Sequence, residues 1–174
     1  LTLVFLIRAT TSIFPQREFV YTTNAAAVCS FTPLEDQGGV TDAIVRNFAM
    51  EAVIDLHALD YVNFRSTLDR VTSTQFTPDA RVAAAQALRD SGILTTVTQR
   101  FFILRAVQRD TAVILEKGVV NGRYQWRVSV PITLAYTSAG REGSPTYRPE
   151  DRDVVLTIVR AEQSAANPLG ILIS

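Results

Sequence analysis

The chain has 174 residues, enough for one domain with a substantial hydrophobic core. Lysine plus arginine and aspartate plus glutamate both total 17, so the formal net charge is zero. A neutral total argues against binding nucleic acid or anionic lipid through charge, which needs a basic patch or stripe. The 47% hydrophobic content and the modest glycine and proline content are typical of a globular protein.

The first seven residues are strongly apolar, and Arg8 follows them. Seven residues are too few to cross a bilayer, which takes about 20 as a helix. Two interpretations stay open from the residues alone: the end of a membrane helix, or a short buried strand or helix end. No complete signal peptide is visible, because the basic n-region and the small-residue cleavage site are absent.

Two short aromatic and β-branched segments, at residues 18–22 and 28–32, predict a small hairpin. The turn chemistry of its connection is weak, because only Asn24 tolerates a left-handed backbone well. Cys29 lies in the second segment and is the single cysteine, which excludes an internal disulfide and a thiolate metal cluster. We interpret Cys29 as a small apolar side chain, since no neighbour carries a positive charge that would activate the thiol.

Three helices are predicted in the middle of the chain. The first begins at Thr41, a suitable N-cap, and runs to about Leu59 with its apolar residues on one stripe. Residues 60–65 open the second, shorter helix. Thr77 starts the third, with a proline in its first turn, and Gly92 is the predicted stop of that helix.

Strands follow the helices, at residues 99–108, 112–120, 123–136 and 153–161. Asn121 and Gly122 predict a type I′ hairpin turn between the second and third strands. In the third strand the even-numbered residues from Tyr124 to Tyr136 are apolar and the odd-numbered ones are mainly polar, which specifies the register. We interpret Trp126 as a core residue, because the aromatic and arginine side chains of this strand lie on opposite faces.

Helices and strands are therefore segregated along the chain, which predicts an α+β fold. We expect a strongly bent four-stranded antiparallel sheet packed on three helices, as in the cystatin-like or nuclear-transport-factor-like cone. The short hairpin would precede this cone. No internal repeat and no second domain is visible.

Motifs for catalysis are scarce. There is no phosphate loop, dinucleotide fingerprint, zinc-protease helix or nucleophile elbow. His57 is the only histidine, which excludes a multi-histidine metal site, and we interpret it as a partly exposed helix residue. Glu51 and Asp55 lie one turn apart and could split their pKa values, but we favour partnership with arginines of a neighbouring element. The only cluster that could serve an enzyme is Asp55, His57, Asp60 and Tyr61, and we assign no catalytic, cofactor-binding or metal-binding residue.

Several strings in the chain resemble the DotI/IcmL/TraM family of type IVB secretion and conjugation systems. They are Asn47-Phe-Ala-Met-Glu-Ala52, Asp60-Tyr-Val-Asn-Phe-Arg65, Phe76-Thr-Pro78, Asn121-Gly-Arg-Tyr-Gln-Trp-Arg-Val128 with Pro131, and Thr157-Ile-Val-Arg160. The strings occur in the family's order and cover roughly residues 19–170. One departure is residues 24–26, where the family's first hairpin has an Asp-Gly-like turn.

The resemblance implies a non-catalytic scaffold that needs no cofactor. Residues 1–8 would then be the end of a single membrane helix, 9–17 a linker, 18–166 a periplasmic cone-like domain and 167–174 a C-terminal tail. It implies attachment to the bacterial inner membrane, self-association and contacts with other secretion components, with no direct contact with nucleic acid.

Two further points stay open at this stage. Leu169, Ile171 and Ile173 look too apolar for a free end, so we expect the tail to contact a neighbouring molecule. The alternative function is a cone-fold small-molecule binder or enzyme that uses a carboxylate and histidine pocket.

Overall fold

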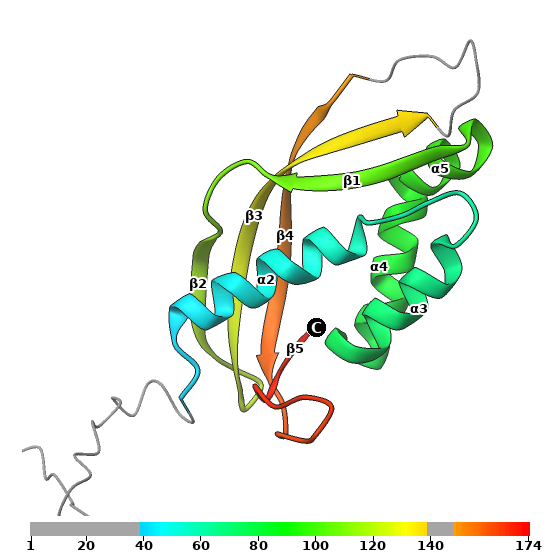
Figure 1. Cartoon of the computed structure of the whole chain (residues 1–174). Coiled ribbons are helices and arrows are strands. Elements are labelled where there is room, and N and C mark those ends of the chain that lie inside the picture. Colours follow the sequence, from blue (N-terminus) through cyan, green and yellow to red (C-terminus); the bar gives the residue numbers. More distant parts are fainter. Residues whose placement is uncertain (1–38, 139–147) are drawn as a thin grey trace, which may run out of the picture. The chain divides into compact units, whose positions relative to one another are not determined.

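The computed structural model describes residues 39–138 and 148–174 (Figure 1). The helices are α2 (Asp42–Leu56), α3 (Phe64–Gln75), α4 (Pro78–Asp90) and α5 (Ile93–Arg100). The strands are β1 (Phe102–Gln108), β2 (Val113–Val120), β3 (Arg123–Ser138), β4 (Glu150–Arg160) and β5 (Ile171–Ile173). The predicted hairpin, the apolar residues 1–8 and Cys29 lie outside the described residues.

Capping residues set two of the helix starts, as predicted. The Thr41 hydroxyl accepts a hydrogen bond from the Ile44 N–H, and the Thr77 hydroxyl accepts one from the Ala80 N–H, both at 3.4 Å. Pro78 lies in the first turn of α4, where its missing N–H removes no helical hydrogen bond.

The predicted end of the first helix and the predicted start of the second helix were wrong. α2 ends at Leu56, before the predicted Leu59. Leu59 is nevertheless fully buried, and its carbonyl accepts a hydrogen bond from the Leu104 N–H at 2.7 Å. The second helix begins only at Phe64, because residues 60–63 form a bridge and a turn instead of a first helical turn.

The structure has a fourth helix that the sequence analysis missed. Gly92 ends α4 with a φ of 75°, as predicted, but α5 follows at once over residues 93–100, of which only residues 99 and 100 had been assigned, to the start of a strand. Three threonines give this segment strand propensity, yet Ile93 and Val97 lie one turn apart and are both buried. Tertiary packing therefore overrides propensity here. Phe101, at φ 57°, ends the helix and turns the chain into β1.

β3 is the centre of the antiparallel sheet. β2 pairs with residues 123–129 of β3, and β1 pairs with residues 132–138 along the same edge. β4 pairs with the other edge of β3. The hairpin between β2 and β3 turns at Asn121 and Gly122, with φ of 52° and 77°, which confirms the predicted turn.

Pro131 lies at the point of β3 where the partner changes from β2 to β1. Its carbonyl accepts a hydrogen bond from the Arg109 N–H at 3.1 Å, in the connection between those two strands. A strand residue directs its N–H and C=O toward the same edge, so the missing N–H of Pro131 falls at the gap in the ladder. A proline is therefore tolerated inside a central strand.

The concave face of the curled sheet packs on α2, which crosses it (Figure 1). The even-numbered face of β3 is buried as predicted, with Trp126 at 4% exposure and Val128, Val130, Ile132 and Leu134 at 0%. The predicted cone, an antiparallel sheet bent over helices, is confirmed, and residues 39–138 and 148–174 contain four helices in place of the three predicted.

The C-terminal segment belongs to the fold and is not a tail outside it. Ile171–Ile173 is β5, which pairs with residues 158–160 of β4. Ile171 and Ile173 are 0% and 4% exposed, so their apolar character is explained by this domain's own core. Asn167 stabilises the turn that leads into β5, because its side-chain oxygen accepts hydrogen bonds from the Gly170 and Ile171 N–H groups at 3.1 and 3.3 Å.

We predict that Ile171→Ala destabilises the domain by about 2–5 kcal/mol, because it removes a fully buried side chain and leaves a cavity. Leu169→Ala is the matched control. Leu169 lies two residues before Ile171 and its side chain is 39% exposed, so the loss of unfolding free energy should stay below about 1 kcal/mol. Urea unfolding measures both, and equal losses would contradict the assignment of β5 to the core.

Candidate functional site

His57, the single candidate imidazole base, is buried and not partly exposed as predicted. It caps the C-terminal end of α2 and is 4% exposed. Its Nδ1–H donates to the Val53 carbonyl at 2.7 Å, which leaves Nε2 as the nitrogen that would take up a proton. Burial is the main cause that lowers the pKa of His57 below 6.5, although the hydrogen bond to Val53 raises it. Burial therefore disfavours the charged form of the ring in the folded state.

Two other members of the predicted acid–base cluster, Asp60 and Tyr61, have structural roles. The Asp60 carboxylate accepts hydrogen bonds from the Val62 and Asn63 N–H groups at 2.8 and 2.6 Å. These bonds, the one to Asn63 first, lower the pKa of Asp60. The ring of Tyr61 makes an edge-to-face contact with Phe101, with ring centroids 5.5 Å apart. Asp60 and Tyr61 therefore shape the chain between α2 and α3.

The predicted arginine partners of Glu51 and Asp55 are not found. Glu51 is exposed, Asp55 is half-buried, and no ion pair within residues 39–138 and 148–174 includes either one. In the same residues, no three His, Cys, Asp or Glu side chains are grouped as metal ligands would be. None of the four described helices has the length and hydropathy of a membrane span.

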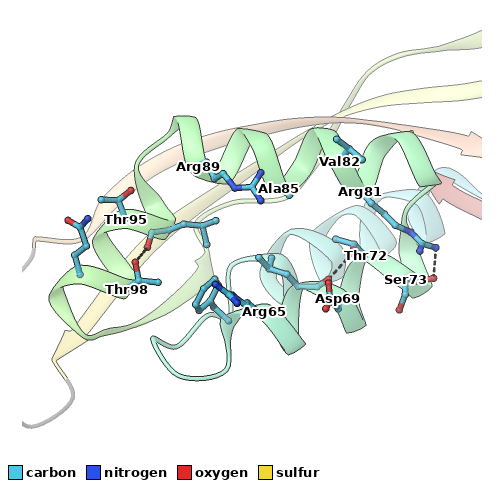
Figure 2. Close-up of a pocket in the computed structure, with 14 residues that line it drawn as sticks. Arg65, Asp69, Thr72, Ser73, Arg81, Val82, Ala85, Arg89, Thr95 and Thr98 are labelled. Atoms are coloured by element: carbon cyan, nitrogen blue, oxygen red, sulfur yellow. Dashed lines mark hydrogen bonds between the residues drawn. The ribbon is translucent and has the colours of Figure 1, made fainter.

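A groove of about 910 Å³ lies between α3, α4 and α5 (Figure 2). We call it the arginine groove. Its apolar lining comes from all three helices: Phe64 and Leu68 of α3, Val82 and Ala85 of α4, and Leu94 of α5. Its charged lining consists of Arg65, Asp69, Arg81 and Arg89.

The arginine groove carries more positive than negative charge, with three guanidinium groups and one carboxylate. Arg81 is tied to the end of α3, because its Nη2 donates to the Ser73 carbonyl at 3.1 Å. Arg65 lies over the Phe64 ring, 5.6 Å from its centroid. Neither Arg65 nor Arg89 takes part in an ion pair in the described part of the chain.

A second cleft, of about 460 Å³, lies on the other side of α4. We call it the edge cleft. One wall is the run of residues 152–157 of β4. The facing wall is a stripe of α4, namely Ala80, Ala83, Ala84, Ala87 and Leu88, followed by Ser91. The cleft is also lined by Ala52, Val53 and Leu56 of α2, by His57 at the C-terminal end of α2, and by Ile93 of α5. Phe76, Ile173 and Ser174 complete the lining.

Neither groove was predicted from the sequence, and neither gathers the four predicted residues. Of the cluster, only His57 lines the edge cleft, and Asp55, Asp60 and Tyr61 line neither groove. A signal was present in α4, where alanines recur at helical spacing with arginines on another side of the helix. The sequence could not say which elements those faces would meet.

The fold is a bent antiparallel sheet packed on helices, and its two surface grooves do not gather the predicted acid–base residues. Solved structures of type IV secretion proteins have the same fold. The chain has 32% identity to the periplasmic domain of DotI over 78% of this chain and 92% of that one, with a TM-score of 0.67. A periplasmic fragment of TraM has 21% identity over 76% and 93%, with a TM-score of 0.66. CagV from Helicobacter pylori strain 26695, a VirB8 homologue of a type IV secretion system, shares the fold at 15% identity and a TM-score of 0.52, over 76% and 93%.

Residues 1–174 match the DotI/IcmL family, described as an inner-membrane complex component of the type IVB secretion system. The chain belongs to this family, as the resemblance in its sequence predicted. No curated protein matches the chain.

We predict that the free energy of unfolding falls as the pH drops below 6.5. In this range His57 takes up a proton more readily in the unfolded chain than in the folded one, because burial lowers its folded pKa. The folded pKa is lowered, so this contribution is complete above pH 6.5 and is lost as the pH falls toward the folded pKa. The slope reaches at most about 1.4 kcal/mol per pH unit for one proton. Urea unfolding between about pH 7 and 5.5 measures it. His57→Gln should flatten the slope, and a slope unchanged by this substitution would contradict the assignment.

Proposed function

We propose that this chain is the periplasmic, non-catalytic scaffold domain of an inner-membrane protein in a type IVB secretion or conjugation apparatus. The family match over residues 1–174 is the observation that carries the proposal. The domain would act by self-association and by contacts with other components. Residues 1–8 would end a single membrane helix that anchors it in the inner membrane.

The candidate acid–base cluster supports a non-catalytic role. His57 is buried, Asp60 accepts backbone hydrogen bonds, and Asp55 and Tyr61 line neither groove. General acid–base catalysis needs its groups within hydrogen-bonding reach of one substrate position. This arrangement favours the scaffold over the alternative of a cone-fold enzyme.

The charge of the arginine groove indicates how one component would bind. Arg65 and Arg89 come from facing helices and have no ion-pair partner within residues 39–138 and 148–174. The apolar lining, which includes Leu68 and Val82, would contact the apolar side of a segment whose carboxylates pair with the guanidinium groups. We therefore include in the proposal that an acidic segment of another component docks here.

The proposal predicts that in-frame deletion of the gene abolishes transfer by the secretion apparatus. The wild-type chain should restore transfer, and so should a chain that carries Asp55→Asn and Tyr61→Phe. These substitutions remove a carboxylate and a hydroxyl while they keep the shape of both side chains. Transfer that is unchanged by the deletion would contradict the proposed function. Restoration by the wild type alone would indicate acid–base chemistry at these residues.

Reversing charge in the arginine groove is expected to weaken assembly. Arg89→Glu places a like charge opposite an acidic segment, so we expect copurification with the other components to fall about tenfold or more. Arg123→Glu is the matched control, because Arg123 is exposed at the start of β3 and lies in neither groove. Copurification from detergent-solubilised membranes measures both. Equal effects of the two variants would show that the groove has no special role.

A further inference from the structure

The hairpin between β2 and β3 turns at the only Asn-Gly pair in the chain (Figure 1). Such a pair can react with itself, because the backbone nitrogen of the glycine can attack the side-chain amide carbon of the asparagine. A glycine has no Cβ to hinder this approach. Asn121 and Gly122 are both exposed. Apart from its neighbours in the chain, no described residue has an atom within 4 Å of the position that a Cβ of Gly122 would occupy.

The two groups that would react are not held by other hydrogen bonds. Within residues 39–138 and 148–174, neither the Asn121 side chain nor the Gly122 N–H has a hydrogen-bond partner. No such bond therefore has to break before the nitrogen attacks. Ring closure still requires the side-chain carbon to reach this nitrogen, so the tight turn must open for a moment.

Little packing holds the tip of this hairpin closed. Every residue of β2 is exposed or half-buried, and Val119 and Val120 beside the turn are 68% and 46% exposed. On the other strand, the first buried residue of β3 is Trp126. Segments with few buried contacts open locally at a small cost in free energy. The tip can therefore open while the rest of the sheet stays paired.

The other described asparagines are each blocked in a different way. Asn47 lies inside α2, where the N–H of the following residue belongs to the helical hydrogen-bond ladder. Asn63 is followed by Phe64, whose N–H donates to the Asp60 carbonyl at 3.0 Å. Asn167 is followed by a proline, which has no N–H. The hairpin asparagine is thus the exception among them.

We propose that Asn121 is a site of spontaneous deamidation. The Gly122 nitrogen loses its proton to a base in solution and forms a bond to the side-chain carbon of Asn121, and ammonia leaves. The product is a five-membered succinimide ring. Water then opens this ring at either of its two carbonyl carbons, which gives aspartate or isoaspartate. One water is consumed and one ammonia is released, so the reaction needs no oxidant or reductant, and the inference does not rest on the proposed function.

The two products affect the hairpin differently. Aspartate keeps the turn, because Asp-Gly also favours the type I′ geometry, and it adds a negative charge beside the exposed Arg123. Isoaspartate directs the chain through the side-chain carbon, which lengthens the backbone of the turn. The pairing of Val120 with Arg123 should then be lost. The pairing of Lys117 with Trp126 should remain, since Trp126 is buried.

Ageing of the purified full chain in warm neutral buffer with detergent tests the proposal. Peptide mapping by mass spectrometry follows the conversion of each asparagine, and circular dichroism checks that the chain stays folded. We expect conversion at Asn121 to be at least about tenfold faster than at Asn47 or Asn63. Asn121→Gly is the matched control, because Gly-Gly suits the same turn and has no side-chain amide, so this peptide should not change. Asn121→Asp provides the chromatographic standard for the aspartate product.

A synthetic peptide of residues 116–126 shows how fast the same sequence reacts without the folded sheet. Conversion in the folded chain within about tenfold of the rate in this peptide supports an open hairpin tip. A larger difference would overturn the inference, because the turn would then protect the asparagine. Conversion at Asn121 that is no faster than at Asn47 would overturn it too.

Hydrogen exchange on the aged sample tests the effect on the hairpin. The peptides that contain asparagine, aspartate and isoaspartate at position 121 separate by chromatography, so each can be measured on its own. We expect the amides of residues 120–123 to exchange about tenfold faster in the isoaspartate form than in the aspartate form. Equal exchange in the two forms would contradict the predicted opening of the turn.

Discussion

β3 is the strand on which the sheet depends, because β1, β2 and β4 all pair with it. Side chains alternate on a strand, so its 16 residues present one continuous apolar row to the concave face. Burial of that row, from Trp126 to Leu134, against α2 fixes which side of the sheet faces inward. A shift by one residue would place polar and charged side chains such as Arg127 in the core. The curled sheet and the position of the helices follow from this constraint.

Features set by local chemistry could be predicted from the sequence. The caps Thr41 and Thr77, the turn at Asn121 and Gly122 and the alternation of β3 depend on neighbouring residues, and all were confirmed. Features set by distant partners could not be predicted. α5 is a helix because Ile93 and Val97 meet the core, although the threonines between them favour a strand. The seat of β5 requires β4 and the start of α4, which only tertiary structure brings together.

The candidate site shows the same division. Sequence reasoning found the residue types that could do acid–base work, but their roles depend on burial and backbone contacts. His57 lies at the end of α2, where the chain turns, and this places its ring in the interior. The two grooves are products of packing, since α4 is a wall of both. Helix α4 has mainly alanines on one side and arginines on another, so the two grooves have different linings.

The central role of β3 also affects the order in which the chain can fold. Helices α2 to α5 precede every strand in the described sequence, and β1 and β2 pair with β3 and not with each other. None of the described strands can therefore pair along its length until β3 has been synthesised, and β5 joins the sheet after β4. Until then the apolar stripe of α2 has no sheet to cover it. The contacts that stabilise the fold are long-range, so folding is slow compared with helix formation, and a newly made chain exposes apolar surface for that time.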